Sequence, residues 1–303
     1  MRETIGFVGL GVMGGPMAAR LVAAGHRVVG YDLDPEAVAT AREHGVEIGR
    51  DAAHCAAEDG LFLTSMRMPD QVRAVMVDGG ALAALRPGTI WADCTTNRIE
   101  LLQELAAAAP DGVEVVDSPV TGAVDGARHG RLTLFVGGAD PALDRLVPVL
   151  EHLGAVIRCG RLGTGNVTKL VTNQLWFIHA AAIGEAFALG MANGVELDVL
   201  WGAIKDSVAD SFVARHDAPS IFAGHYDPSF KLDLCLKDLG LTMDLATNVG
   251  ADLPLTERAN ETFASAADRY GRDVGELSVA RRIEDDAGLS FRLDGDWIPH
   301  WEA

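Results

Sequence analysis

The sequence predicts an α/β fold in which an N-terminal domain of alternating strands and helices is followed by an all-helical domain. Three observations predict it. Short β-branched runs alternate with runs of helical period up to about residue 162, the strand pattern then stops, and a long apolar stretch without proline follows at 166–194. We expect one domain over residues 1–162, a second over residues 163–303, and a long interdomain helix that joins them.

Seven segments of the first domain are short and rich in β-branched or aromatic residues, which is typical of strands. They are 4–9, 26–32, 61–66, 89–94, 113–119, 132–138 and 155–160. Apolar residues three and four positions apart predict helices at 13–25, 34–45 and 98–109. Because strands and helices alternate, the strands are expected to run parallel and to be joined by crossover helices.

The second domain shows only helical patterns. The segment 166–194 is apolar throughout, which predicts a largely buried helix of about 28 residues, roughly 42 Å long. Further helices are expected at 198–209, 230–250, 254–271 and 275–288. The aromatic tail 289–303 is either docked on a neighbouring subunit or disordered.

Composition limits the partners of this chain. The net charge of −18 argues against a nucleic-acid partner and against an anionic membrane surface, because both need a basic face. Glycines and Pro16 interrupt the first 25 residues, which therefore make a poor signal peptide. No apolar run reaches the roughly 20 residues that span a bilayer.

The four cysteines are too widely spaced for a metal-binding or redox CxxC pair, and they suggest no disulfide framework. They stand at positions 55, 94, 159 and 235. We expect no metal site and a reducing, cytoplasmic location.

The segment GFVGLGVMGG contains a G-x-G-x-x-G pattern at Gly9, Gly11 and Gly14. With 34 glycines in the chain the pattern alone is weak, but it follows a predicted strand and opens a predicted helix. In that context the first glycine permits a tight turn, the second lets backbone approach a pyrophosphate, and the third packs helix on strand. The first domain is therefore expected to be a Rossmann-type dinucleotide-binding domain, with residues 9–14 around the phosphates.

Asp32 ends the second predicted strand, where an acidic residue is expected to bind the adenosine ribose. Its carboxylate would accept from both ribose hydroxyls and repel a 2′-phosphate, so NAD is favoured over NADP. The alternative is a turn or helix-capping aspartate, and Asp34, directly before Pro35, suits that role better.

The segment 117–138 joins two predicted strands and holds Thr121, Gly122 and Ala123 in a glycine-rich stretch. Successive N–H groups in such a turn can form a nest for an anion, here a carboxylate. A glycine-rich hairpin without chemical function is the alternative.

Lysine is rare in this chain, since 21 of the 25 basic residues are arginine. The lysines are Lys169, Lys205, Lys231 and Lys237. A lysine amine can exchange a proton near neutral pH, whereas a guanidinium stays charged. Lys205 and Lys231 are expected at the surface.

Asn166 suits the N-cap of the long helix, which would place Lys169 in its first turn. There the helix dipole, together with partial burial, would disfavour the ammonium form and lower the amine pKa, as an acid–base residue requires. Asn173 lies four residues later on the same face and could orient the lysine or a substrate hydroxyl. An ordinary surface lysine is the alternative. Alternatively, Lys237 could serve only in an ion pair with Asp233, four residues earlier on the same helix.

Four blocks of this sequence resemble the β-hydroxyacid dehydrogenases, the family of 3-hydroxyisobutyrate dehydrogenase and tartronate semialdehyde reductase. They are GFVGLGVMGGPMAARL, DSPVTGAVDGARHGRLTLFVGG, GTGNVTKLVTNQ and FKLDLCLKDLGLTMDLAT, within residues 4–285. The resemblance implies NAD(P)-dependent oxidation of a small 3-hydroxy acid, or the reverse reduction, with a 3-hydroxyisobutyrate-like substrate as the first choice.

The resemblance also implies roles for individual residues. Lys169 would be the catalytic acid–base group, with Asn173 as its helix partner, and Lys237 would contact substrate or cofactor. The substrate carboxylate would bind at Thr121, Gly122 and Ala123. The implied cofactor contacts are Gly9, Leu10, Gly11, Val12, Met13, Gly14, Asp32, Met66, Thr96 and Phe230.

The chain departs from the family pattern in four places. Ala123 replaces a usual glycine, Asn173 alone remains of a common asparagine pair, and Arg67 stands where an apolar Leu-Pro is usual. The segment 93–100 lacks the proline that generally follows the hydroxyl pair. These changes leave the chemistry intact but leave the identity of the 3-hydroxy acid open.

Three other functions remain open. An imine reductase shares this architecture but usually carries a different proton donor at the lysine position. A sugar-phosphate dehydrogenase would need clustered arginines in the helical domain. A non-enzymatic dinucleotide-binding scaffold would not need Lys169 or the 117–138 loop.

Assembly follows from the 166–194 helix, which is apolar around most of its circumference and must bury more than one face. We expect a homodimer or homotetramer with the helical domain in the interface, and an active-site cleft between the two domains.

Overall fold

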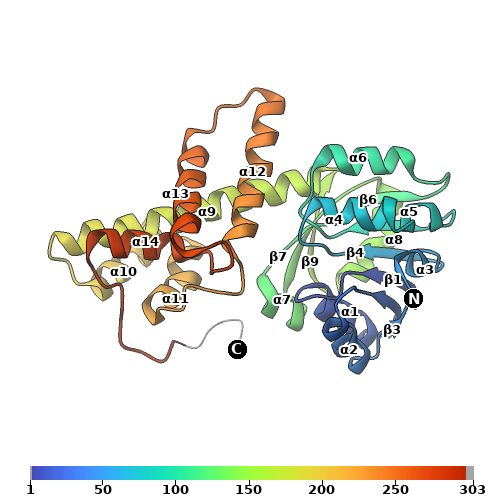
Figure 1. Ribbon diagram of the computed structural model, residues 1–303, viewed down its shortest axis with the longest axis horizontal. Helices are drawn as coiled ribbons and strands as arrows, with labels where there is room; N and C mark the ends of the chain where they lie inside the picture. The colour runs from blue at the N-terminus through green and yellow to red at the C-terminus, as the bar shows by residue number, and fades with distance from the viewer. Residues whose placement is uncertain (1, 298–303) are drawn as a thin grey trace. The chain divides into compact units, whose positions relative to one another are not determined.

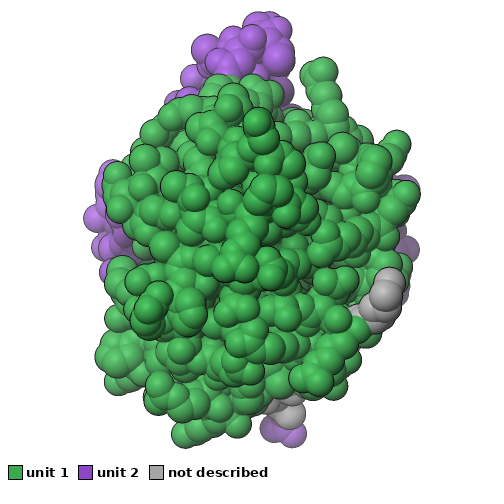
Figure 2. All heavy atoms as spheres, turned by 90° about the vertical axis from the view of Figure 1, so that its right-hand side faces the viewer, with its two compact units in different colours: residues 1–169 green, residues 170–303 purple. Residues whose placement is uncertain are grey.

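The computed structural model describes residues 2–297, and the chain divides into two compact units, residues 1–169 and 170–303 (Figure 1; Figure 2). The first unit is an α/β structure and the second is helical, as the sequence predicts. The division falls inside the long helix, somewhat beyond the domain boundary expected after residue 162, and that boundary stays a prediction.

The first unit is built on one sheet with the strand order β3-β2-β1-β4-β5-β6-β8-β7, and β9 pairs with β8. The strands are β1 Thr4–Val8, β2 Arg27–Tyr31, β3 Glu47–Ile48, β4 Leu61–Thr64, β5 Ile90–Asp93, β6 Glu114–Asp117, β7 Val120–Thr121, β8 Leu132–Gly137 and β9 Gly154–Gly160. All seven expected strands are present, and β3 and β7, of two residues each, are additional. From β3 to β6 the strands run parallel in the doubly wound order.

Alternate side chains of each central strand enter separate cores on the two faces of the sheet. Phe7 of β1 belongs to one core and Val8 to the other, and neighbouring residues of β4 and β5 divide in the same way. Helices cover both faces, because the crossover after each parallel strand must pack back onto the sheet. They are α1 Gly14–Ala23, α2 Pro35–Glu43, α3 Ala52–Ala56, α4 Pro69–Arg73, the π-helix η1 Ala74–Asp78, α5 Ala81–Ala84, α6 Ile99–Ala108, α7 Ala123–His129 and α8 Asp140–Leu150.

The expectation of a wholly parallel sheet is wrong at β8, which runs antiparallel to β6 and β7. The chain between β6 and β8 contains only β7 and the seven-residue helix α7. That connection pairs β7 directly with β8 instead of passing across the sheet as a parallel crossover does. With β9, which is parallel to β8, these strands form an extension at the β6 edge.

In its described residues, 170–297, the second unit contains helices and one isolated bridge, between Lys231 and Gly275. Its elements are most of α9 Thr164–Ala192, then α10 Leu197–Lys205, the π-helix η2 Val213–Asp217, α11 Ala218–Ala223, α12 Leu232–Val249, α13 Pro254–Tyr270 and α14 Ser278–Ala287. The five expected helices are present, and η2 and α11 are additional. Their core contains the fully buried rings of Phe177, Phe187, Phe263 and Phe291.

The expectation that α9 is largely buried is wrong. Phe177 and Phe187 face the core of the second unit, whereas the opposite face leaves Val171, Leu175 and Leu189 47%, 53% and 70% exposed. By length and composition α9 could also cross a membrane. The sequence analysis did not identify it as a candidate span because it required an unbroken apolar run of about 20 residues. A core helix of a soluble protein meets the same criterion, and Asn166, Asn173 and Lys169 are buried within this fold.

The C-terminal segment after α14 lies on the second unit of its own chain up to Trp297. Phe291 is fully buried against Phe187, and the Trp297 ring lies 5.9 Å from that of Trp201. For this part of the tail, neither disorder nor docking on a neighbouring subunit is needed. Residues 298–303 of the predicted tail lie outside the described residues.

Candidate active site

The glycine loop between β1 and α1 has the local geometry that its spacing predicts. A Cβ on Gly9 would lie 2.2 Å from the Ser65 carbonyl oxygen, and one on Gly14 would lie 1.8 Å from that of Gly9. A Cβ on Gly11, in contrast, would meet nothing within 4 Å, which leaves open space beside the backbone. The first and third glycines are thus needed for packing, and the second for the approach of a ligand.

The helix that follows this loop begins without a side-chain cap. Met13 occupies the N-cap position and accepts no hydrogen bond from the first turn through its side chain. Helix N-termini present N–H groups and the positive end of the helix dipole, which suits a phosphate. Val12 is 71% exposed and leaves the turn accessible. The residues present therefore fit the pyrophosphate of a dinucleotide.

Asp32 lies directly after β2 and holds the glycine loop. Its Oδ2 accepts from the Leu10 N–H at 2.6 Å, and its Oδ1 accepts from the Asp34 N–H at 2.9 Å. Asp34 caps α2 through the N–H of Glu36, as the sequence predicts, so the helix cap does not need Asp32.

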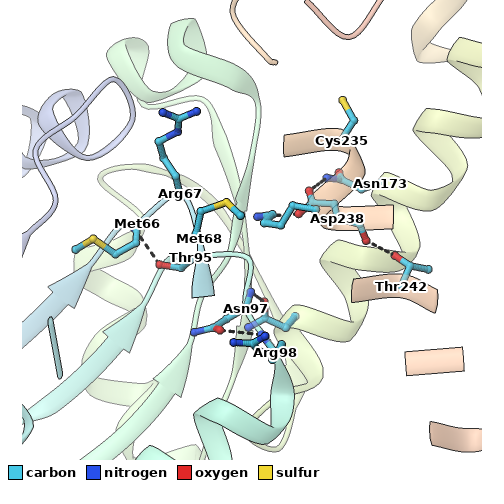
Figure 3. A network of polar contacts seen from close by, with 12 residues as sticks. Met66, Arg67, Met68, Thr95, Asn97, Arg98, Asn173, Cys235, Asp238 and Thr242 are labelled. Carbon is cyan, nitrogen blue, oxygen red and sulfur yellow. Dashed lines mark hydrogen bonds and ion pairs between the residues drawn. The ribbon is translucent and has the colours of Figure 1, made fainter. Parts of the chain in front are cut away.

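The ends of β4 and β5 bring two further predicted cofactor contacts to the same edge of the sheet. Met66 follows β4, and its N–H donates to Thr95 Oγ1 at 2.9 Å (Figure 3). Thr96 follows Thr95 directly after β5. The carboxyl ends of neighbouring parallel strands are where open α/β sheets bind ligands.

A buried polar network lies under these strand ends, and sequence reasoning missed it. The Asp93 carboxylate, fully buried at the end of β5, accepts from Thr64 Oγ1 at 2.9 Å and from Asn97 Nδ2 at 2.8 Å. Burial raises the pKa of the Asp93 carboxyl, and these hydrogen bonds oppose the shift. The only signal in the sequence is an aspartate at the end of a predicted strand.

A second buried carboxylate, that of Asp117 at the end of β6, holds the start of α9. Oδ1 accepts from the Gly163 N–H at 2.7 Å, and Oδ2 accepts from the Asn166 N–H at 2.6 Å. Burial raises the pKa of Asp117 to about 6 although these N–H groups lower it. A Cβ on Gly137 or Gly165 would lie within 3 Å of the carboxylate, so both glycines are needed for this close packing.

The prediction that Asn166 caps the long helix is wrong, because α9 begins at Thr164 and Asn166 lies within its first turn. Asn166 Oδ1 instead accepts from the Asn97 N–H at 2.7 Å, and its Nδ2 donates to Asp117 at 3.2 Å. Lys169 therefore lies in the second turn, where the dipole effect has weakened. Its side chain is buried, with the residue only 6% exposed.

The predicted carboxylate loop begins on β7 and enters α7. Gly122 and Ala123 have φ of 119° and 54°, and Ala123 is thus a non-glycine residue in the left-handed region. Helix α7 packs against α1, with Gly130 directly beside the Arg20 guanidinium. The loop therefore lies beside the helix that the dinucleotide loop opens, within the first unit.

In the second unit, Asn173 and Lys237 meet at a residue that the sequence analysis missed. Asn173 Nδ2 donates to Asp238 Oδ2 at 2.7 Å (Figure 3). Lys237 Nζ lies 2.8 Å from Asp238 Oδ1. Asn173 and Asp238 are 3% and 1% exposed. The expected alternative partner of Lys237, Asp233, pairs with Arg272 instead. The signal was present, since Asp238 is adjacent to Lys237 in the fourth block.

Phe230, implied as a nicotinamide neighbour, precedes α12 and packs on α9. Its ring centroid lies 5.3 Å from that of Trp176 and 6.4 Å from that of Phe177. Among residues 2–297 no group of three His, Cys, Asp or Glu side chains is arranged to hold a metal ion.

Replacement of Asp117 tests the buried carboxylate. Its folded-state pKa of about 6 lies above the ordinary value of 3.8, so its contribution to stability is present below about pH 4 and is lost as the pH rises through 6. Asp117→Asn cannot ionise. Its unfolding free energy should therefore rise relative to wild type by on the order of 2–3 kcal/mol between about pH 4 and pH 7 in urea titrations.

The exposed Asp111→Asn variant controls for the loss of one carboxylate from an acidic chain. A difference between Asp117→Asn and wild type that stays constant across this pH range would contradict the assignment.

Comparison with known proteins places the chain in a family. The model described as the NAD binding domain of 6-phosphogluconate dehydrogenase matches residues 4–163, and that described as NAD-binding of NADP-dependent 3-hydroxyisobutyrate dehydrogenase matches residues 163–283. A probable 3-hydroxyisobutyrate dehydrogenase of Mycobacterium tuberculosis H37Rv is 35% identical over 294 residues, which cover 94% of this chain and 99% of that protein. The L-threonate dehydrogenase of Escherichia coli K12 is 34% identical over 275 residues, with 89% and 91% covered.

The solved structure of the Mycobacterium tuberculosis 3-hydroxyisobutyrate dehydrogenase with L-serine superposes with a TM-score of 0.87 at 34% identity and covers 93% of this chain and 99% of that one. These matches confirm the resemblance and the fold class inferred from the sequence. The chain belongs to the β-hydroxyacid dehydrogenase family and is an NAD(P)-dependent oxidoreductase of 3-hydroxy acids.

Proposed function

We propose that the chain oxidises a small 3-hydroxy acid of the 3-hydroxyisobutyrate type with Lys169 as the proton-transfer group. The observation that carries the proposal is a buried amine one helical turn before an asparagine whose orientation is fixed. Lys169 is only 6% exposed, and a lysine amine, unlike a guanidinium, can give up and take a proton near neutral pH. A bound nicotinamide supplies the hydride chemistry.

Each proposed residue has one task in this reaction. Lys169 removes the hydroxyl proton as the carbonyl forms, and it returns the proton in the reverse direction. The Asp238 carboxylate accepts from the Asn173 amide nitrogen, which fixes how that amide faces a substrate hydroxyl. Lys237, only 10% exposed on its side chain, is held by Asp238 as a cation for substrate or cofactor.

The backbone of the Thr121–Ala123 segment would receive the substrate carboxylate. The left-handed φ of Gly122 and Ala123 makes a turn at the start of α7, and turns are among the places where backbone N–H groups can bind an anion. The methyl group of Ala123 narrows the floor of this proposed pocket compared with a glycine, which favours a small substrate.

The other functions are less well supported. The relatives named above are hydroxyacid dehydrogenases. Imine reductases usually have a different proton donor at the position that Lys169 occupies here, and Lys169 is buried. A non-enzymatic scaffold would give no reason to keep the buried Asn173–Asp238 pair with Lys237 beside it. Turnover of cyclic imines without activity on any hydroxy acid would favour the reductase, and unchanged NADH fluorescence with every 3-hydroxy acid would favour the scaffold.

We also infer a preference for NAD over NADP and a cytoplasmic location. The preference rests on the Asp32 carboxylate, which lies beside the loop that would hold the phosphates. The second family model is described from an NADP-dependent dehydrogenase, so the preference is proposed for this chain and not for the family. The location rests on the four cysteines, all of which are free.

A homodimer or homotetramer is supported by the exposed face of α9. Val167, Val171, Leu175, Ile178, Ala182 and Leu189 follow one another at spacings that keep to one side of the helix. We define these six residues as the α9 seam. An apolar strip of this length favours coverage by a second copy of the chain.

Replacement of Lys169 tests the proton-transfer role. Lys169→Ala should lower kcat by about 10²- to 10⁴-fold with NADH affinity nearly kept, because binding does not use the amine. Lys169→Arg should be similarly slow, since a guanidinium does not give up its proton. Lys205→Ala, whose amine lies over the Trp201 ring, is the matched control. Wild-type turnover in Lys169→Ala would exclude the role.

Cofactor preference is tested at the end of β2. Wild-type kcat/KM should favour NAD over NADP at least tenfold, or about 1.4 kcal/mol. Asp32→Ser combined with Leu33→Arg should narrow or invert this ratio, because Leu33 is 86% exposed and an arginine there could meet a 2′-phosphate. Leu33→Arg alone is the control, because it keeps the repulsion between the Asp32 carboxylate and the 2′-phosphate of NADP. Equal use of both cofactors by the wild type would contradict the preference.

Assembly is tested by light scattering at micromolar concentration. The wild type should have two or four times the chain mass of 32.0 kDa, and Val171→Asp with Leu175→Asp should shift it toward a monomer. Val208→Asp, at a fully exposed loop residue, is the control. A fully active wild-type monomer would contradict the oligomer and leave the chemistry unchanged.

A further inference from the structure

The loop between α11 and α12 has an unusual backbone conformation shortly before Phe230, the residue implied as a nicotinamide neighbour. Tyr226 and Asp227 have φ of 54° and 47°, so two consecutive residues other than glycine lie in the left-handed region. A bulky side chain rarely adopts this conformation, and it persists only where the surrounding structure holds it. The contacts of these two residues therefore decide how the loop reaches Phe230.

The Tyr226 hydroxyl is held by two charged groups. It donates to Glu284 Oε2 of α14 at 2.7 Å, and it accepts from the Arg292 guanidinium. Burial raises the pKa of Tyr226 to about 12, so the hydroxyl keeps the proton that it donates. Glu284 is only 5% exposed, and its Oε1 accepts from the Phe291 N–H at 2.9 Å. One carboxylate thus ties both the loop and the segment after α14 to the same helix.

Arg292 passes close to the start of the loop. Its Nη1 donates to the Ile221 carbonyl oxygen of α11 at 2.9 Å, and a Cβ on Gly224 would lie 2.8 Å from its Nε. Phe291 beside it is fully buried, with its ring against that of Phe187 in the core of the second unit. We define these two residues, 291 and 292, as the C-terminal strap.

Little freedom remains between Tyr226 and Phe230. A Cβ on Gly275 would lie 2.1 Å from the carbonyl oxygens of both Tyr226 and Asp227, so the backbone at 275 packs directly on the loop. The Asp227 carboxylate accepts from the N–H of Ser229 at 2.9 Å and from its hydroxyl at 2.5 Å. A shift at Tyr226 would therefore be passed along the loop instead of being absorbed within it.

Phe230, where the loop reaches α12, is held by its backbone and by its ring. The Glu276 N–H donates to the Phe230 carbonyl oxygen at 2.9 Å. The ring lies 5.3 Å from that of Trp176, on the helix that also carries Asn173. The position of the ring therefore depends on the loop as well as on α9.

We propose that Tyr226, held by the C-terminal strap and Glu284, positions Phe230 for the nicotinamide ring. Tyr226 is a positioning residue, because it acts through Phe230 and not on the reacting atoms. Its effect falls on the nicotinamide half of the cofactor and not on the adenosine and pyrophosphate half, for which the glycine loop of the first unit is proposed. This inference rests on the proposed function, because it needs a bound nicotinamide.

The test compares the binding of NADH with that of ADP-ribose, which has the adenosine and the pyrophosphate but no nicotinamide. Tyr226→Phe removes one hydroxyl and leaves Glu284 and Arg292 paired with each other at 3.1 Å. Calorimetry should show that Kd for NADH rises about fivefold, the size expected for one hydrogen bond, while Kd for ADP-ribose is unchanged. Arg292→Lys keeps the charge but lacks the planar group that donates to several acceptors, and it should give the same NADH-specific loss.

A double-mutant cycle shows whether Tyr226 acts through Phe230. Phe230→Ala alone should weaken the binding of NADH and not that of ADP-ribose, and adding Tyr226→Phe to it should raise Kd for NADH no further. Tyr270→Phe is the matched control, because the Tyr270 hydroxyl also donates to a carboxylate of α14, that of Asp285, at 2.5 Å. Its loss should leave both affinities unchanged.

Three results would overturn the inference. They are equal weakening of NADH and ADP-ribose binding in Tyr226→Phe, wild-type NADH affinity in that variant, and an NADH loss that persists undiminished in the Phe230→Ala background. A purely structural role predicts the first or the third. Because the readout is binding, failure of the wild type to oxidise any hydroxy acid would overturn the proposed function and leave these comparisons unaffected.

Discussion

The position of the proposed catalytic lysine depends on one buried carboxylate. A helix begins with N–H groups that have no partner in the helix, and at α9 two such groups donate to Asp117. Asp117 ends β6, so the sheet and the helix are joined at this point. Lys169 follows only three residues after Asn166, and its place relative to the strand ends is therefore set by this contact. Burial of the carboxylate is costly, as its raised pKa shows, and the fold keeps it nonetheless.

The network around Asp117 also joins the helix to the cofactor edge of the sheet. Asn166 receives the Asn97 N–H, and Asn97 donates to the Asp93 carboxylate, which in turn accepts from Thr64. These contacts connect the ends of β4, β5 and β6 within the first unit. Because each buried polar group has its partner in another element, a single replacement leaves a buried group unsatisfied. The strand ends that carry Met66 and Thr96 are held in this way.

Features whose physics is local could be predicted from the sequence, and features that need a distant partner could not. Gly9, Gly11 and Gly14 matter because of the space beside their own backbone, and Asp34 caps the helix that follows it directly. Both features could therefore be predicted from short segments of the sequence. Asn166 shows the limit. Asparagine favours an N-cap locally, but here its side chain bonds Asn97 and Asp117, 69 and 49 residues away in the chain. Asp117 and Asp93 were missed for the same reason. The direction of β8 was wrong because periodicity identifies a strand without identifying its neighbour.

Arginine and lysine are divided between the surface and the interior of the described structure. In the described residues, arginine supplies nearly all the ion pairs of the half-exposed and exposed surface. A guanidinium is permanently charged and weakly hydrated, so it gives up little hydration free energy when it pairs with a carboxylate. Of the four lysines, Lys205 lies over Trp201 and Lys231 pairs with an exposed aspartate. Lys169 is buried and the Lys237 side chain is only 10% exposed, and these are the two lysines for which we propose roles. A buried guanidinium would stay charged in this setting, whereas an amine can become neutral and exchange a proton. Scarcity of lysine at the surface therefore made the buried lysines conspicuous in the sequence.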